Sequence, residues 1–336
     1  MPVSCCAGGC PMRNRSSEMA AFKNEDGSAI TTTDTAFRRA LLHVARPVAN
    51  TYGAIRFSGL VHRDGVACSK VAITNTLGAI DVHAPGADME RIILHFHGGA
   101  FVLGSMWLTR DLVGRLSAAA GVRIISVEYR LAPQHPYPAA LDDAMTAWRW
   151  VRREHPTASI AVGGDSAGGN LSFALMVKLA QLGEELPVAC LGMSPWLNVA
   201  REGMAVSNDV TCETVGYGIS LDSWKKGALR CKERYCKEHP PSDPLVSPVL
   251  ASEDLVRKFP PVCIHAAEGE PPHLVEDSKD MAALCQRCGV TAELQLFPES
   301  RHVFQTEGTW DSSKDSLAKM GAFLARTWPQ KQEACP

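Results

Sequence analysis

The stretch GGDSAGGN, residues 163–170, sets one serine, Ser166, among residues with little or no side chain. The pattern G-x-S-x-G is formed by Gly164, Asp165, Ser166, Ala167 and Gly168. An apolar segment typical of a strand precedes it, and an apolar segment typical of a helix follows. A sharp turn from strand to helix holds a serine hydroxyl outward and leaves no room for larger neighbours. We therefore predict that Ser166 is a nucleophile.

A serine hydroxyl needs a base at neutral pH, and the base needs a carboxylate that orients it. At turns of this type the order along the chain is serine, acid, histidine. The histidines that follow the serine are His239, His265, His273 and His302. His302 lies in FPESRHVF, after the last expected strand, where a loop can return to the serine. His265 lies inside an apolar strand and is typical of a core residue, so we predict His302 as the base.

The acid is expected where the preceding strand, VCIHAAEGE, ends. Glu270 is the preferred candidate because Pro271 interrupts the strand directly after it. The same stretch keeps three alternatives open, of which the last two are expected to face solvent on the following helix: Glu268, Glu276 and Asp277. Each of these acids is also compatible with a plain solvated position.

A second glycine-rich strand end, HFHGGAF at residues 95–101, has the features of a loop that binds an oxyanion. Glycines leave backbone N–H groups uncovered, and such groups stabilise the negative oxygen of a tetrahedral intermediate. We predict Gly98 and Gly99 as donors, together with the N–H of Ala167 after the serine. His97 is expected to shape this loop rather than to transfer protons.

These residues must be positioned by alternating strands and helices. Strands are expected at 91–99, 122–129, 159–166, 188–196, 262–270 and 291–299, with two short strands around a turn in 71–85. Helices are expected at 36–50, 109–120, 137–156, 170–183, 272–289 and 312–328. This alternation predicts an α/β fold with a mostly parallel central sheet and helices on both faces. In such sheets the active site lies at the carboxyl ends of the strands.

Several motifs in this order resemble the hormone-sensitive-lipase-like group of α/β-hydrolase esterases. They are HGGAF, VEYRLAPQHPYPAALDDA, GDSAG, MSPWLN, DPLVSPVLA and FPESRHVF. The resemblance spans residues 70–328 and implies an α/β-hydrolase fold with Ser166 as nucleophile, His302 as base and the same three oxyanion donors. One departure concerns the acid, because the segment after Glu270, PPHLVED, is two residues longer than the family's usual pattern.

The resemblance also implies a division of the chain and a substrate. It implies a helical cap built from an N-terminal segment, 31–70, and an insertion at about 197–235 within the hydrolase domain, 71–328. The remaining residues, 1–30, are expected to be a disordered tail. Candidate residues for the substrate pocket are Trp196, Tyr217 and Trp224. The implied activity is hydrolysis of short- to medium-chain acyl esters or lactones through an acyl-enzyme, without a cofactor. Amide deacetylation and non-catalytic ligand binding on the same scaffold are the alternatives, and the histidine at position 302 favours an enzyme.

Composition limits the other classes of function. The net charge is −2 without a basic stripe, so nucleic acid is not an expected partner. No run of about 18 apolar residues and no basic-apolar leader is present in the sequence, and we expect a cytoplasmic protein without a membrane span. The 12 cysteines are expected to be free thiols, and their spacing does not indicate a metal site.

Overall fold

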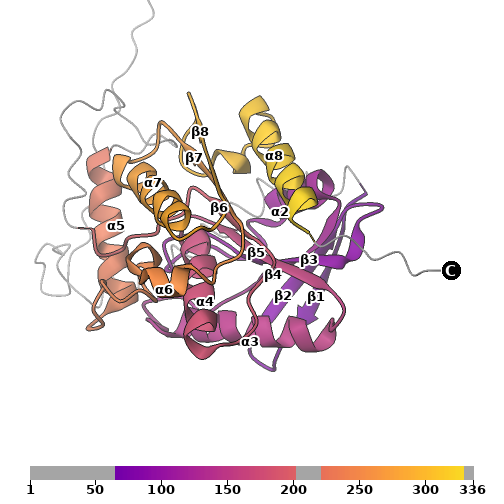
Figure 1. Cartoon of the computed structure of the whole chain (residues 1–336), viewed down its shortest axis with the longest axis horizontal. Helices are drawn as coiled ribbons and strands as arrows, with labels where there is room; N and C mark the ends of the chain where they lie inside the picture. The colour runs from indigo at the N-terminus through magenta and orange to yellow at the C-terminus, as the bar shows by residue number, and fades with distance from the viewer. Residues whose placement is uncertain (1–64, 202–220, 329–336) are drawn as a thin grey trace, which may run out of the picture. The chain divides into compact units, whose positions relative to one another are not determined.

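The computed structural model describes residues 65–201 and 221–328, and in the second range it describes side chains from residue 226 onward (Figure 1). All described residues belong to one compact unit of the chain. Several predictions lie outside them: the tail 1–30, nearly all of the N-terminal segment 31–70 with its helix at 36–50, and residues 202–220 of the insertion.

One sheet forms the centre of this unit. Its strands are β1 (Ala67–Ala72), β2 (Gly78–His83), β3 (Asp88–Phe96), β4 (Val122–Val127), β5 (Ser159–Asp165), β6 (Cys190–Met193), β7 (Val262–Ala267) and β8 (Ala292–Phe297). They lie in the order β1-β2-β4-β3-β5-β6-β7-β8. β2 is antiparallel to both of its neighbours, and all other pairs are parallel. The carboxyl ends of β3 and β5 to β8 therefore meet at one edge.

Helices cover both faces of the sheet (Figure 1). On one face lie α2 (Arg110–Ala120) and α8 (Asp311–Thr327). On the other face lie α3 (Ala139–Glu154), α4 (Ala167–Leu182), α6 (Glu253–Val256) and α7 (Pro272–Arg287). α5 (Leu221–Cys236) adds Tyr235 and Cys236 to the apolar cluster of this side. Short 3-10 turns occupy Pro248–Leu250 and Phe304–Thr306. The predicted α/β architecture, a mostly parallel sheet with helices on both faces, is confirmed.

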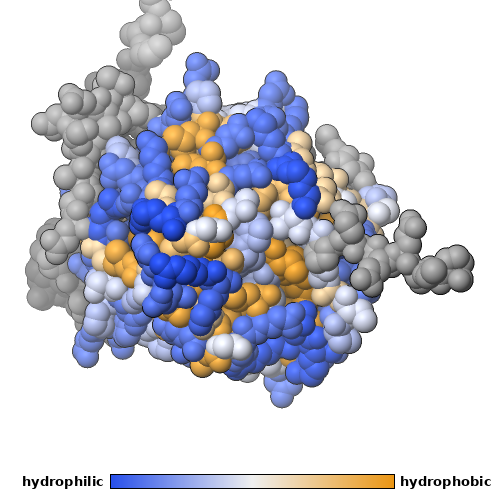
Figure 2. Space-filling model, in the orientation of Figure 1, coloured by the Kyte–Doolittle hydropathy of each residue, from blue (hydrophilic) through white to orange (hydrophobic). Residues whose placement is uncertain are grey.

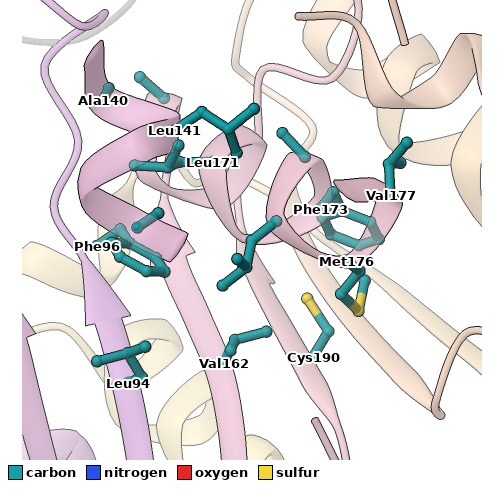
Figure 3. Packing of buried hydrophobic residues seen from close by; sticks show 14 of the residues in the cluster. Leu94, Phe96, Ala140, Leu141, Val162, Leu171, Phe173, Met176, Val177 and Cys190 are labelled. Carbon is teal, nitrogen blue, oxygen red and sulfur yellow. The ribbon is translucent and has the colours of Figure 1, made fainter. Parts of the chain in front are cut away.

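The core explains why the helix after the serine is apolar all round. α4 packs on the middle strands and is covered by neighbouring helices, so nearly every one of its side chains is buried. Figure 3 shows this packing, with side chains from three strands beneath two helices: Leu94, Phe96, Val162 and Cys190 under Ala140, Leu141, Leu171, Phe173, Met176 and Val177. Burying one large apolar side chain contributes about 1.5–3 kcal/mol, so this layer fixes the serine turn firmly.

Several boundaries differ from the sequence prediction, and β7 ends at Ala267, three residues before the predicted strand end at Glu270. α4 begins at Ala167, three residues before the predicted start at 170, because its first-turn glycines allow the helix to start beside the strands. β6 ends at Met193, since Ser194 leaves the strand with a φ of 47°. The sheet begins at Ala67, inside the segment that the sequence assigned to the N-terminal cap.

The outer surface matches this layered architecture. On the face shown in Figure 2, hydrophilic residues predominate and hydrophobic residues form smaller areas between them. Within residues 65–201 and 221–328, no helix combines the length and the apolar character needed to cross a bilayer.

Candidate active site

The turn between β5 and α4 carries Ser166 in a strained conformation. Its φ is 52°, a region that residues with a side chain rarely adopt. The turn is fixed by the Ser166 N–H, which donates to the Met193 carbonyl at 2.9 Å. A Cβ at Gly164 or Gly168 would lie 2.3 or 1.9 Å from the carbonyl oxygen of Phe96, so only glycine fits there. Backbone from β3 therefore presses on the turn and enforces its geometry.

The structure brings three predicted residues into one hydrogen-bonded chain. The Ser166 hydroxyl donates to His302 Nε2 at 3.0 Å, and His302 Nδ1 donates to Glu270 Oε2 at 2.6 Å. The other oxygen of Glu270 accepts the Ala267 N–H at 3.1 Å, which fixes the carboxylate. Glu270 and His302 are buried, with 3% and 8% of their surface exposed. A neighbouring carboxylate places the proton of a neutral imidazole on Nδ1, so Nε2 can accept the serine proton.

The three alternative acids lie elsewhere. Glu268 and Glu276 are exposed, and Glu276 pairs with Arg201 at 3.2 Å. The prediction that Asp277 faces solvent is wrong, because this residue is fully buried. It accepts hydrogen bonds from Arg201 Nε at 2.8 Å and from the Asn198 N–H at 2.9 Å. Desolvation raises the pKa of Asp277 to about 7, with Arg201 opposing that shift.

The other histidines after the serine have separate surroundings. His239 pairs with Asp243 at 2.7 Å. His265 is buried in β7, as predicted for a core residue, with Nδ1 2.9 Å from the Ser316 hydroxyl oxygen. His273 is buried in the first turn of α7. None of these imidazoles hydrogen-bonds to Ser166 among the contacts of the described residues.

Burial of His265 has a consequence for stability that can be measured. Desolvation first, and Lys319 second, lower the pKa of His265 to about 4, while Asp315 opposes them. In the unfolded chain the imidazole titrates near 6.5. As the pH falls, the unfolded chain therefore takes up this proton before the folded chain does, and folding becomes less favourable. We expect wild type to lose up to about 3 kcal/mol more free energy of unfolding than His265→Gln between pH 6.5 and 4. Denaturant titrations across this range test it, and parallel pH profiles for the two proteins would contradict it.

The loop after β3 approaches the serine turn closely. A Cβ at Gly98 would lie 2.2 Å from Asp165 Oδ2, so only glycine fits there. Gly99 has a φ of 122° and Ala100 has a φ of 53°. These two positive values turn the backbone sharply at the end of β3.

Side chains beneath this loop hold its shape. The Tyr129 hydroxyl donates to the His97 carbonyl at 2.6 Å, and the two rings stack with centroids 4.3 Å apart. His97 Nδ1 lies 2.8 Å from the Gly98 carbonyl oxygen. Asp165 is buried, and desolvation raises the pKa of its carboxyl to about 6 against the Gly98 N–H. These contacts agree with a role of His97 in shaping the loop.

Ser194, which sequence reasoning did not single out, connects the serine turn with the histidine loop. Its hydroxyl accepts the N–H of Val303, the residue after His302, at 3.2 Å. Its own N–H donates to the His265 carbonyl at 2.7 Å. Two residues later, the Trp196 N–H donates to the Ser166 carbonyl at 3.1 Å. The segment 194–196 thus contacts Ser166 and the residue that follows His302.

Loss of the Ser194 hydroxyl should therefore disturb this alignment. We expect Ser194→Ala to lower kcat by about 10- to 100-fold with little change in KM, because a misplacement of about 1 Å costs on that order. Ser117→Ala is the matched control. The Ser117 hydroxyl accepts the buried Ala84 N–H at 2.9 Å, and neither residue belongs to the candidate active site. Both variants orphan a buried N–H and should lose about 1–3 kcal/mol of stability. Steady-state kinetics that show equal kcat for the two would contradict the prediction.

A cavity of about 510 Å³ opens beside the serine. Besides Ser166 and His302, its walls include Trp196, as predicted for the substrate pocket. Tyr217 and the side chain of Trp224 lie outside the described residues. Gly99 and Asp165, which the sequence analysis named for other roles, also line the cavity. Sequence reasoning missed the remaining lining residues, which come from the loop after β3, from α5, from α7 and from the loop after His302: Ala100, Leu103, Gly227, Ala228, Cys231, His273, Leu274, Val303 and Thr306.

Comparisons with known proteins agree with this architecture. A family model described as alpha/beta hydrolase fold matches residues 93–306. An acetyl-hydrolase of Streptomyces hygroscopicus is 33% identical over 242 residues, 71% of this chain and 77% of that protein. The carboxylesterase/phospholipase LipF of Mycobacterium tuberculosis is 29% identical over 286 residues, 83% of this chain and 74% of that protein.

A solved structure gives the same picture in three dimensions. It is that of an esterase from the bacterial hormone-sensitive lipase family, with a TM-score of 0.72 and 27% identity. The alignment covers 88% of this chain and 99% of that one. Since the family model spans the strands and loops that carry Ser166, Glu270 and His302, the chain belongs to the α/β-hydrolase fold family.

Proposed function

We propose that the protein hydrolyses carboxylic esters through an acyl-enzyme formed on Ser166. The observation that carries this proposal is the hydrogen-bonded chain from Ser166 through His302 to Glu270, with distances of 3.0 and 2.6 Å, beside the cavity. An exposed nucleophile, a base within reach of its proton and a carboxylate that orients the base are what acyl transfer needs.

The geometry suggests how each step proceeds. His302 Nε2 takes the hydroxyl proton as Ser166 Oγ attacks the carbonyl carbon of the ester. Glu270 keeps the proton of the imidazole on Nδ1 and stabilises the imidazolium that forms. His302 then returns the proton to the leaving alcohol, and the acyl group stays on Ser166. A water molecule, deprotonated by His302, releases the acid by the reverse sequence.

The oxyanion of each tetrahedral intermediate needs backbone donors. We assign this role to the N–H groups of Gly98, Gly99 and Ala167, which belong to the loop after β3 and to the start of α4. Ala167 is the first residue of α4, where helix N–H groups lack partners within the helix. One such donor contributes about 2.7–4 kcal/mol to the stabilisation of the transition state.

The cavity suggests which esters fit. Its volume of about 510 Å³ lies within the range of small-molecule sites, about 300–1,000 Å³. Trp196, Leu103 and Leu274 give it apolar walls. These features favour short- to medium-chain acyl esters or lactones, and they are the finer part of the proposal.

Parallel assays on esters and amides test the reaction class. We expect turnover of p-nitrophenyl acetate and butyrate, and rates on the matching p-nitroanilides that are lower by orders of magnitude. Faster cleavage of the anilides would make the protein an amide hydrolase instead. Tight binding of the esters without turnover would indicate a ligand-binding protein on a hydrolase scaffold.

A further inference from the structure

One glycine of the cavity wall has no packing contact among the described residues that would require a glycine. Gly227 lies within α5, whose bounds are Leu221–Cys236, and lines the cavity that contains Ser166 and His302. Among the described residues, no atom lies within 4 Å of a Cβ built at this position, so a side chain would meet open space. Its φ is not positive, and the backbone would accept any ordinary residue.

Three other helical glycines of the described chain, Gly168, Gly169 and Gly321, show what a structural reason looks like, whereas Gly114 does not. A Cβ at Gly321 of α8 would lie 2.4 Å from the Ala119 carbonyl oxygen, where two helices approach closely. In α4, a Cβ at Gly168 or Gly169 would lie 1.9 Å from Phe96 or 2.7 Å from Pro195. At Gly114 of α2 the distance to Val66 is 3.4 Å, an ordinary contact. Glycine is one of the least favourable residues in a helix interior, so at Gly227 the helix bears a cost that packing does not explain.

Gly227 is one of three residues of α5 that line the cavity. Ala228 and Cys231 of the same helix also line it, so the wall formed by α5 carries short side chains. Burial raises the pKa of the Cys231 thiol to about 11, so the wall stays uncharged at neutral pH. Burial of an apolar part of the substrate against this wall is favourable, because apolar surface leaves water. Burial of a charged group there is unfavourable, because the charge loses its hydration.

We propose that Gly227 is a specificity-determining residue. The volume left by its missing side chain accommodates the apolar part of the ester, and it allows the enzyme to accept chains that reach from Ser166 to α5. The inference rests on the proposed ester hydrolysis and extends it to the substrate class, which is esters with an extended apolar chain. A larger side chain at position 227 should then shorten the accepted chain and leave the chemistry intact.

Three substitutions of graded size test this inference: Gly227→Ala, Gly227→Leu and Gly227→Phe. In all three we expect kcat/KM for p-nitrophenyl acetate to fall less than kcat/KM for the longer esters. For p-nitrophenyl octanoate we expect a loss of about tenfold or more with Leu, and a larger loss with Phe, as for other apolar pockets. A second series, acetate esters of alcohols from ethanol to octanol, shows whether the acyl or the alcohol part lies against α5, and selective loss in either series supports the proposal.

Stability measurements and a matched variant separate a filled pocket from a damaged helix. Gly227→Ala should raise the thermal midpoint, because alanine is the better helix former. Leu229→Phe places an aromatic ring on the exposed side of the same helix, outside the cavity, and should leave the chain-length profile unchanged. An unchanged ratio of octanoate to acetate activity in Gly227→Phe would overturn the inference, as would an equal loss on both esters. Absence of ester hydrolysis in wild type would instead refute the proposed function.

Discussion

Ser166→Ala is expected to lower kcat for p-nitrophenyl butyrate by about 10⁴- to 10⁶-fold, the range found when the nucleophile of a serine hydrolase is removed. Without Oγ, no acyl-enzyme forms, and only the oxyanion donors and the cavity act on bound ester. The remaining rate should equal that of water attack in a site that still binds the substrate. Stopped-flow or long-time spectrophotometric assays cover this range of rates.

Unfolding of the variant would not account for such a loss. Ser166 lies in a turn fixed by backbone contacts to Met193 and Trp196, and these do not involve its hydroxyl. The thermal midpoint of Ser166→Ala should therefore stay close to that of wild type. Activity within about tenfold of wild type in a folded variant would show that another group performs the attack, and the proposed mechanism would be wrong.

Glu270→Gln is expected to lower kcat by about 10³- to 10⁴-fold. The amide keeps the size of the side chain, but it removes the charge that stabilises the imidazolium and disturbs the tautomer with the proton on Nδ1. The Ala267 N–H, which donates to Oε1 at 3.1 Å, can still donate to an amide oxygen and favours an orientation with the amide nitrogen toward His302. His302 would then accept on Nδ1 and lose its free acceptor at Nε2.

Glu268→Gln is the matched control for this substitution. Glu268 lies two residues earlier in the same loop, and its side chain is exposed. We expect its kcat to remain within about twofold of wild type, because exposed charges contribute little at a distance. A larger loss in Glu268→Gln than in Glu270→Gln would mean that the acid has been assigned to the wrong residue.

Glycines that end helices made much of the fold predictable from sequence. Gly121 and Gly183 adopt left-handed conformations directly after α2 and α4, where the sequence predicted helix ends. Continuous apolar runs correctly indicated the buried strands. The boundaries that differ depend on contacts between residues far apart in the sequence. One example is the close approach of Gly168, in the first turn of α4, to Phe96 of β3.

The site was predictable where it depends on chain order and less so where it depends on tertiary contacts. The predicted trio lies within hydrogen-bonding distance, and its roles stay predictions until they are tested. The close approach of the Asp165 carboxylate to Gly98 could not be foreseen, because these residues are 67 positions apart and meet only when β3 and β5 pair. The burial of Asp277 likewise depends on Arg201, which approaches from the loop after β6.

The lining of the cavity was the least predictable part. Gly227 and His273 belong to helices whose cavity-facing side is decided by how they pack over the strand ends. Periodicity alone assigns an apolar face to a core, and it does not distinguish packing against protein from packing against a ligand. The prolines before His273 marked the start of a helix and carried no signal of a pocket.

Labelling with a fluorophosphonate probe tests the central claim most directly. The probe phosphorylates a serine that a neighbouring base activates, and it requires no knowledge of the natural ester. We expect one adduct per chain, located by peptide mass spectrometry at Ser166, with the labelling rate reduced by about 10³-fold or more in His302→Gln. Wild-type protein that stays unlabelled, or that carries the adduct at another residue, would contradict the account.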